Sequence, residues 1–273
     1  MHSTRLMYTA KIIHFMKTAL QLLSFGTLFI LFGCVTLYKP NAIHSPLLKE
    51  KGELTTSASL GLSGCGLYNV QAAYGLWNHT GVMIDGMYHA RHSSNADSSV
   101  ENLDMFFGEA GAGYFAAFGD SKNGLFQCYS GGGYGITTDK VTTASPPDPE
   151  MNAKYFTLFI QPGMAFTRKY FELAFDMRAN YVRLFKIHAY LYDQFEWWNT
   201  DFKFYSDTAL YFMNLEPTVT ARAGGEKWKG VMQLGVTIPA IHSDAYFKMN
   251  TSSLLIVPLF KFSIGVNYTF IRK

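Results

Sequence analysis

The chain has 273 residues, of which 48% are hydrophobic, 16% aromatic and 16% charged. Its formal net charge of +3 is too small to indicate nucleic-acid binding, and the sequence contains no block of basic residues. An ordinary soluble domain has about 25% charged residues, so this chain is poor in charge, while 23 Phe, 17 Tyr and 24 Gly are abundant. The composition favours one domain with a large lipid-facing surface and disfavours a helical enzyme.

Residues 1–33 have the pattern of a secretory signal peptide. Basic residues at Arg5, Lys11 and Lys17 precede an apolar run over residues 19–32. Such a run is short for a membrane-spanning helix and typical of the apolar core of a signal peptide. We therefore expect the chain to be exported.

The end of this segment, Leu31-Phe32-Gly33-Cys34, resembles the lipobox of bacterial lipoproteins. The resemblance implies cleavage before Cys34 and attachment of lipid to its thiol. Phe32 departs from the usual small residue at its position, so ordinary signal-peptidase cleavage near Gly33 is the alternative. The other two cysteines, Cys65 and Cys128, are expected to be separate thiols.

The next stretch, residues 34–52, lacks a regular pattern of apolar residues. Its Pro40, Asn41 and Pro46, together with several charged side chains, disfavour helices and strands. We expect a periplasmic lead-in here, followed by a domain that comprises residues 53–273.

Residues 53–273 contain segments in which apolar and polar side chains alternate, as they do in a strand with one apolar face. Charged residues almost never fall on the apolar face. Pro162 lies inside one segment and indicates a bulge, because proline cannot donate a ladder hydrogen bond. The predicted strands are residues 53–62, 66–77, 81–91, 104–118, 124–136, 154–166, 170–182, 211–222, 228–238 and 260–270.

Short and long connections alternate along these strands. Short ones follow the second, fourth, sixth and eighth strands, and long ones follow the third, fifth, seventh and ninth. Short turns at one end and long loops at the other are typical of membrane barrels. The sequence therefore predicts an all-β fold, an antiparallel transmembrane β-barrel of about ten strands. Eight or twelve strands stay open if the first or fifth segment is misassigned.

The last strand has aromatic residues near both ends and closes on Phe270, three residues before the chain ends. It resembles the C-terminal strand of small bacterial outer-membrane β-barrel proteins, which serves as their assembly signal. The resemblance implies the outer membrane of a Gram-negative bacterium, outer-membrane lipids as neighbours, and the barrel assembly machinery as a partner during biogenesis.

If the apolar faces contact lipid, charged side chains point into the barrel. A ten-stranded barrel is only slightly wider than the eight-stranded size that side chains fill. We therefore expect ion pairs to plug the lumen, with a narrow polar passage or a ligand pocket as the alternative. The predicted polar network consists of Asp85, Arg91, Glu109, Glu172, Asp176, Arg178, Glu216, Arg222 and Lys261.

The sequence contains no pattern that indicates catalysis, a metal or a cofactor. It lacks a G-x-S-x-G motif, metal-ligand spacing and a phosphate loop. Asp85 and His89 share one face of a predicted strand, but four residues along a strand span about 13 Å, too far for a hydrogen bond.

We therefore expect a non-enzymatic outer-membrane barrel with a structural, adhesive or minor binding or transport role, and the sequence identifies no ligand. The alternative is a surface or periplasmic lipoprotein with a soluble β-sandwich or a lipocalin-like cup. In such a cup the apolar faces would point inward and bind an apolar ligand.

Overall fold

The structure is a computed structural model. The chain divides into two units, Met1–Gly33 and Cys34–Lys273. The described residues all belong to the second unit, so the predicted signal peptide, Cys34 and Cys65 lie outside them. Among these residues there is no helix long and apolar enough to span a membrane. The structure describes residues 38–61, 66–94, 100–142, 150–192, 202–206, 210–242 and 260–271.

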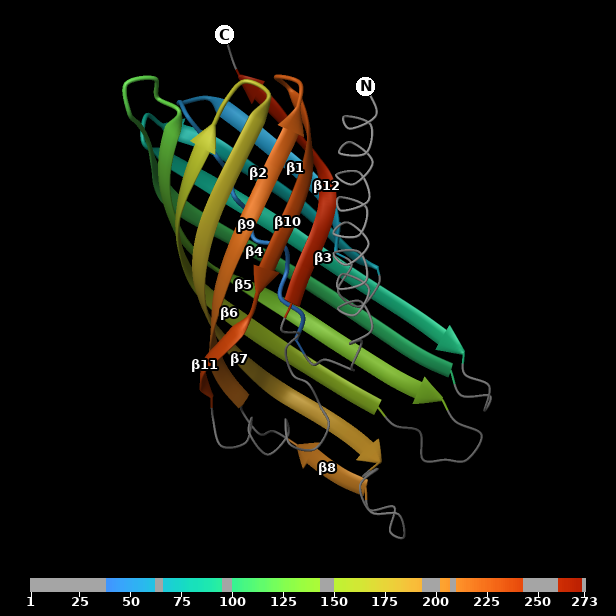
Figure 1. Cartoon of the computed structure of the whole chain (residues 1–273). Helices are drawn as coiled ribbons and strands as arrows, with labels where there is room; N and C mark the ends of the chain where they lie inside the picture. Colours follow the sequence, from blue (N-terminus) through green and yellow to red (C-terminus); the bar gives the residue numbers. More distant parts are fainter. Residues whose placement is uncertain are drawn as a thin grey trace, which may run out of the picture. The chain divides into compact units, whose positions relative to one another are not determined.

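The described part is a sheet of twelve antiparallel strands, ten of which form a closed barrel (Figure 1). The order around the barrel is β1-β2-β3-β4-β5-β6-β7-β9-β10-β12, and β12 pairs with β1 to close it. The strands are β1 (Glu53–Gly61), β2 (Leu67–Trp77), β3 (Thr80–Ser94), β4 (Val100–Phe118), β5 (Gly124–Thr142), β6 (Glu150–Thr167), β7 (Phe171–Tyr192), β8 (Phe202–Ser206), β9 (Leu210–Gly224), β10 (Trp228–Val236), β11 (Ile238–His242) and β12 (Phe260–Ile271).

The predicted fold class is confirmed, and each predicted strand corresponds to one strand of the barrel. The short strands β8 and β11 pair with β7 and β9 outside the ring of ten. The bulge predicted at Pro162 is wrong. β6 and β7 have the same register on either side of Pro162, and Cys128 on β5 pairs directly with it. An interruption of the ladder without a change of register accommodates the missing donor.

Strands β3 to β7 are longer than the sequence indicates. They have between 15 and 22 residues, whereas β1 and β10 have 9 each. Their paired backbones continue into stretches predicted as long loops, where burial still alternates but apolar side chains such as Leu103 and Leu184 face inward. One side of the barrel therefore extends beyond the other at the end opposite the short turns (Figure 1).

The barrel has two distinct rims. The connections 78–79, 119–123, 168–170 and 225–227 lie at one rim, where β1 also begins and β12 ends; we call this the short-turn rim and the opposite one the long-loop rim. At the short-turn rim the Lys169 ammonium donates a hydrogen bond to Glu226, which raises the pKa of Lys169 and lowers the pKa of Glu226. Both side chains are exposed, so solvent screens this pair.

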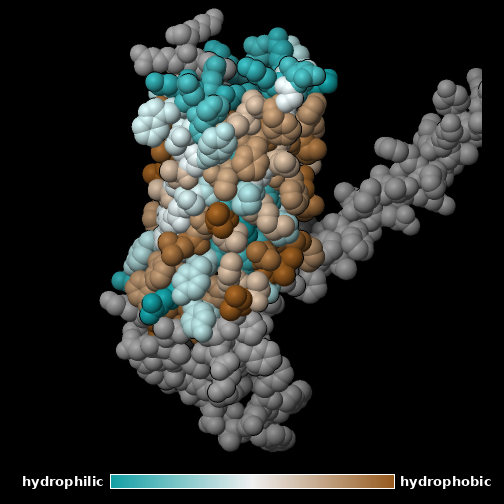
Figure 2. All heavy atoms as spheres, turned by 90° about the vertical axis from the view of Figure 1, so that its left-hand side faces the viewer, coloured by the Kyte–Doolittle hydropathy of each residue, from teal (hydrophilic) through white to brown (hydrophobic). Residues whose placement is uncertain are grey.

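The outer wall of the barrel is apolar. Burial alternates along the strands, and the side chains of Val70, Ile84 and Phe106 are each more than 60% exposed. Figure 2 shows an apolar lateral surface below a hydrophilic cap at the short-turn rim. The apolar faces thus point outward, which is the orientation expected of a lipid-facing barrel and the reverse of that expected of a soluble cup.

Aromatic side chains gather on this wall at two levels. Trp77, Phe118, Phe166, Tyr170 and Trp228 are exposed close to the short-turn rim. A second group lies roughly 25 Å closer to the long-loop rim, given ten or so residues of tilted strand. Its ring pairs have centroids 6.1 to 6.4 Å apart and consist of Tyr134, Phe156, Tyr181 and Phe185.

Candidate functional site

The interior of the barrel holds a segment of the chain itself. Residues 38–49, here called the luminal segment, have no regular secondary structure, and residues 38–48 are buried. Their irregular sequence predicted a lead-in separate from the barrel. The structure instead places them inside it, because the inward side chains of the strands satisfy their polar groups.

The luminal segment runs along the barrel from the half nearer the long-loop rim to the short-turn rim, and three contacts with β7 show this path. Asn180 donates a hydrogen bond of 2.8 Å to the Tyr38 hydroxyl. Four residues closer to the rim, Asp176 accepts a hydrogen bond from the Ser45 hydroxyl. Next to the rim, Glu172 lies 3.6 Å from the Lys49 ammonium. The chain then turns at Gly52 and begins β1.

Apolar contacts hold the luminal segment at both ends. The Tyr38 ring packs edge-on against Tyr155 and Phe212, with centroids 5.2 and 5.6 Å away. At the other end Leu47 and Leu48 join a buried cluster just inside the short-turn rim. The remaining members of that cluster are Ala73, Met83, Phe115, Leu125, Tyr129, Phe159, Ala165 and Ala174.

Amide side chains of the barrel bind the main chain between these ends. The Ala42 N–H donates to Asn69 Oδ1 at 3.1 Å, and Gln71 Nε2 donates to the Ala42 carbonyl at 2.8 Å. Gln233 accepts from the Ile43 N–H at 2.9 Å and donates to the Ile43 carbonyl at 2.8 Å. A buried extended chain without a strand partner leaves such groups unsatisfied at a cost. Here side-chain amides take the place of a neighbouring strand.

The same kind of contact continues toward the short-turn rim, where three more inward side chains reach main-chain groups. Gln161 Nε2 donates to the His44 carbonyl at 2.7 Å, and the Leu47 N–H donates to Gln127 Oε1 at 3.2 Å. Between them the Arg222 guanidinium donates to the Ser45 carbonyl. The lumen therefore binds Ala42, Ile43, His44, Ser45 and Leu47 through their peptide groups, independently of their side chains.

The barrel wall also contains buried ion pairs of its own. Lys261 Nζ donates to Glu216 at 2.8 Å, and Glu172 lies 3.2 Å from Lys229 Nζ and 3.8 Å from Arg222 Nη1. These pairs link neighbouring strands and strands further apart around the barrel. Buried charges need such partners, because an unpaired charge in the interior is costly.

The structure buries eight of the nine residues of the predicted polar network, and Arg91 is half-buried. The charged residues could be found in the sequence because they alternate with apolar residues along each strand and so share its polar face. The inward amides occupy the same face and have the same spacing, but the predicted network contained charged residues alone; these amides are Asn69, Gln71, Gln127, Gln161 and Gln233. The contribution of residues 38–49 had no such signal.

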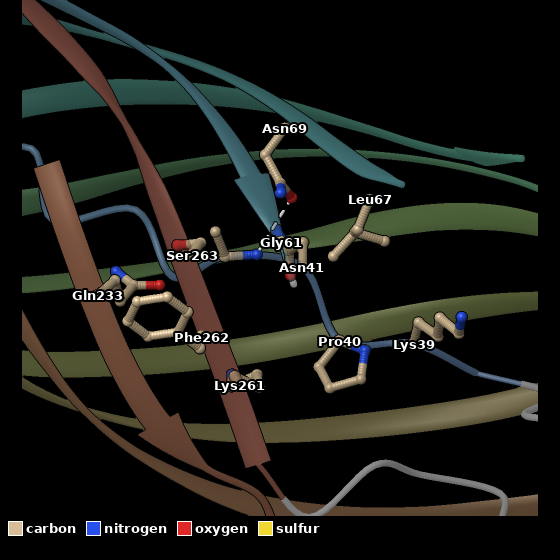
Figure 3. A pocket seen from close by; sticks show the side chains of 11 residues that line it. Lys39, Pro40, Asn41, Gly61, Leu67, Asn69, Gln233, Lys261, Phe262 and Ser263 are labelled. Carbon is tan, nitrogen blue, oxygen red and sulfur yellow. Dashed lines mark hydrogen bonds between the residues drawn. The ribbon is translucent and has the colours of Figure 1, made fainter. Parts of the chain in front are cut away.

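Little free space remains beside the luminal segment. A small pocket lies where residues 39–42 face β1, β2, β10 and β12, and it has room only for water-sized molecules (Figure 3). Lys261, Gln233 and Asn69 line it from the wall. The lumen is thus filled by polypeptide in addition to the ion pairs that the sequence predicted.

The described residues include no group of three or more His, Cys, Asp or Glu side chains that could hold a metal ion. His89 and Asp85 contact the luminal segment rather than each other. His89 Nε2 lies 2.7 Å from Lys39 Nζ, and Asp85 Oδ1 lies 2.7 Å from His44 Nδ1. Cys128 is half-buried and has a free thiol.

No family model matches this chain, and a search of curated proteins found no match either. The role of the barrel therefore has to be argued from its geometry.

Proposed function

We propose that this protein is an outer-membrane β-barrel of a Gram-negative bacterium, closed by its own luminal segment, with a structural or adhesive role at the long-loop rim. The observation that carries the proposal is the polarity of the wall: its outer surface is apolar, and its buried charged side chains point inward. A soluble protein would leave this apolar surface in water, far beyond the few hundred Å² that monomers usually expose.

The two levels of aromatic residues support a membrane location. Rings at both lipid–water boundaries of an apolar band about 25 Å tall are typical of outer-membrane barrels. The rings near the short-turn rim and the group around Phe156 have about this separation. The hydrophilic cap at the short-turn rim (Figure 2) would then project into the aqueous phase.

The long strands support a role outside the membrane. A tilted strand crosses the bilayer with about 9–11 residues, whereas β4 to β7 have 18 to 22. The additional strand residues would form a curved sheet outside the membrane at the long-loop rim, where it is accessible to other cells, surfaces or molecules. A filled lumen meanwhile favours a structural or adhesive role over transport in this state.

The proposal is tested by fractionation of the native host, followed by electrophoresis with and without heating. An inserted barrel stays in the carbonate-washed outer-membrane pellet and migrates differently when unheated. Release into the aqueous phase without a mobility shift would refute the proposal in favour of a soluble lipoprotein. Mass spectrometry of the mature N-terminus tests the accompanying proposal that Cys34 is lipidated.

A further inference from the structure

The wall of the lumen contains more acids than bases. Among the described strand residues with buried side chains there are seven carboxylates and four Lys or Arg side chains. These carboxylates are buried, so the excess needs partners. The carboxylates are Glu53, Asp85, Glu109, Asp139, Glu172, Asp176 and Glu216, and the cations are Arg178, Arg222, Lys229 and Lys261.

The luminal segment contacts three wall carboxylates that are not paired with a wall cation. Within the described part of the chain, Asp85, Asp176 and Glu53 form no ion pair with a strand residue. Asp85 lies against the His44 imidazole. Asp176 accepts from the Ser45 hydroxyl, and Glu53 accepts from the Lys49 N–H at 2.6 Å.

The segment also carries basic groups that suit this negative wall. His44 is paired with Asp85, and the Lys49 ammonium lies near Glu172. Lys39 lies in the half of the lumen nearer the long-loop rim, beside His89. The occupant and the wall are therefore complementary in charge, as well as in hydrogen-bonding groups.

The barrel does not depend on the segment for its closure. Residues 38–49 belong to no strand, and β1 and β12 close the wall through nine residue pairs of their own, Glu53↔Ile271 to Gly61↔Ser263. Withdrawal of the segment breaks side-chain contacts but no ladder. It leaves a path lined by amides and by an excess of carboxylates, with the width of an extended chain.

We propose that the luminal segment is a removable peptide stopper and that the barrel without it is a cation-selective pore. Carboxylate side chains favour cations in a narrow pore. The vacated groups Asp85, Asp176 and Glu53 extend along the half of the path nearer the short-turn rim. This inference rests on the proposed function, because only a barrel that spans a membrane conducts ions across it.

The test uses a chain that folds with its stopper in place. A recognition sequence for a site-specific protease is inserted between Lys51 and Gly52, next to the exposed Glu50 at the short-turn rim. The folded protein is inserted into planar bilayers, cut, and washed with urea below the unfolding concentration. We expect no conductance before cutting, and afterwards a steady conductance that prefers K⁺ over Cl⁻ several-fold.

A synthetic peptide with the sequence of residues 38–49 then closes the cut pore, because the binding groups for its main chain remain in the wall. Asp85→Asn combined with Asp176→Asn lowers the K⁺ preference of the cut protein. Glu226→Gln serves as the matched control, since that carboxylate lies outside the lumen on the short-turn rim, and it leaves the preference unchanged.

Each alternative outcome has a distinct meaning. A cut protein that has lost the peptide by mass spectrometry and still conducts no ions overturns the pore, and so does an anion preference. A peptide that resists washing in a Cys34→Ser background, which carries no lipid anchor, overturns the removable stopper. An uncut protein that fails to insert, and shows no heat-dependent mobility, refutes the proposed outer-membrane function instead. As a second variant, His44→Glu with Lys39→Glu in the uncut chain repels the stopper and raises the frequency of channel opening.

Discussion

Arg178 on β7 and Glu109 on β4 meet inside the barrel through two hydrogen bonds, one of them 3.0 Å long, and both side chains are fully buried. The Arg178 guanidinium also lies 3.9 Å above the centre of the Phe159 ring. Asn41 of the luminal segment donates to the same Glu109 carboxylate at 2.8 Å. One pair thus joins two non-adjacent strands and the luminal segment.

Removal of one member of this pair is expected to destabilise the barrel strongly. Arg178→Met or Glu109→Gln should each lower the free energy of unfolding by about 3 to 5 kcal/mol, because a buried charge is left without its partner. The double variant should lose much less than the sum. Urea titration in lipid vesicles measures this, with Lys169→Gln on the exposed rim as a control that leaves stability unchanged. Additive losses would show that the pair is not coupled.

A charge on the outer wall should be costly only at membrane depth. Ile84 lies four residues from the start of β3 at the short-turn rim, on the apolar band, and is 62% exposed. Ile84→Arg is expected to cost about 2 to 4 kcal/mol, whereas Tyr170→Arg at the rim should cost about 0 to 1 kcal/mol. Unfolding titrations in vesicles compare them. Equal, small effects would indicate that the wall faces water.

The position of the luminal segment can be tested with a disulfide. The Ser45 and Thr220 hydroxyl oxygens are 3.3 Å apart. In a background in which the native cysteines are replaced by serine, Ser45→Cys with Thr220→Cys should form a crosslink that changes unreduced electrophoretic mobility. Thr137 points into the lumen from the part of β5 nearer the long-loop rim. Ser45→Cys with Thr137→Cys should therefore form none, and a crosslink there would contradict the described path.

Two glycines make room for the chain at the end of the luminal segment next to the short-turn rim. A Cβ at Gly75 would overlap the Glu50 carbonyl, and one at Gly81 would lie 2.6 Å from the Leu48 side chain. Gly75→Ala is therefore expected to lower stability by about 1 to 3 kcal/mol through overpacking. Gly86→Ala on the outer wall has no neighbour within 4 Å and serves as the control. A neutral Gly75→Ala would mean that the segment leaves the lumen at a different place.

The strands could be predicted from sequence because their signal is local. Along β7 the outward Phe171, Leu173 and Phe175 alternate with the inward Glu172 and Asp176, and a two-residue period is sufficient to place each side chain on a face. The ends of β3 to β7 at the long-loop rim were not predicted in this way. There the polarity reverses, with apolar side chains such as Leu103 and Leu184 inward and polar ones such as Asp104 and Arg183 outward.

The sequence by itself predicted the class of fold, a barrel of about ten strands, and many of the charged residues that the structure buries, because each depends on spacing within a strand. It missed the buried Asp139. Only the tertiary structure decided what those residues contact. Ser45 and Thr220 are 175 residues apart in the chain, and Ile43 and Gln233 are 190 apart. No local pattern records that an irregular stretch before β1 lies within the barrel. That placement follows from closure of the barrel, which encloses a chain segment able to satisfy the polar groups inside.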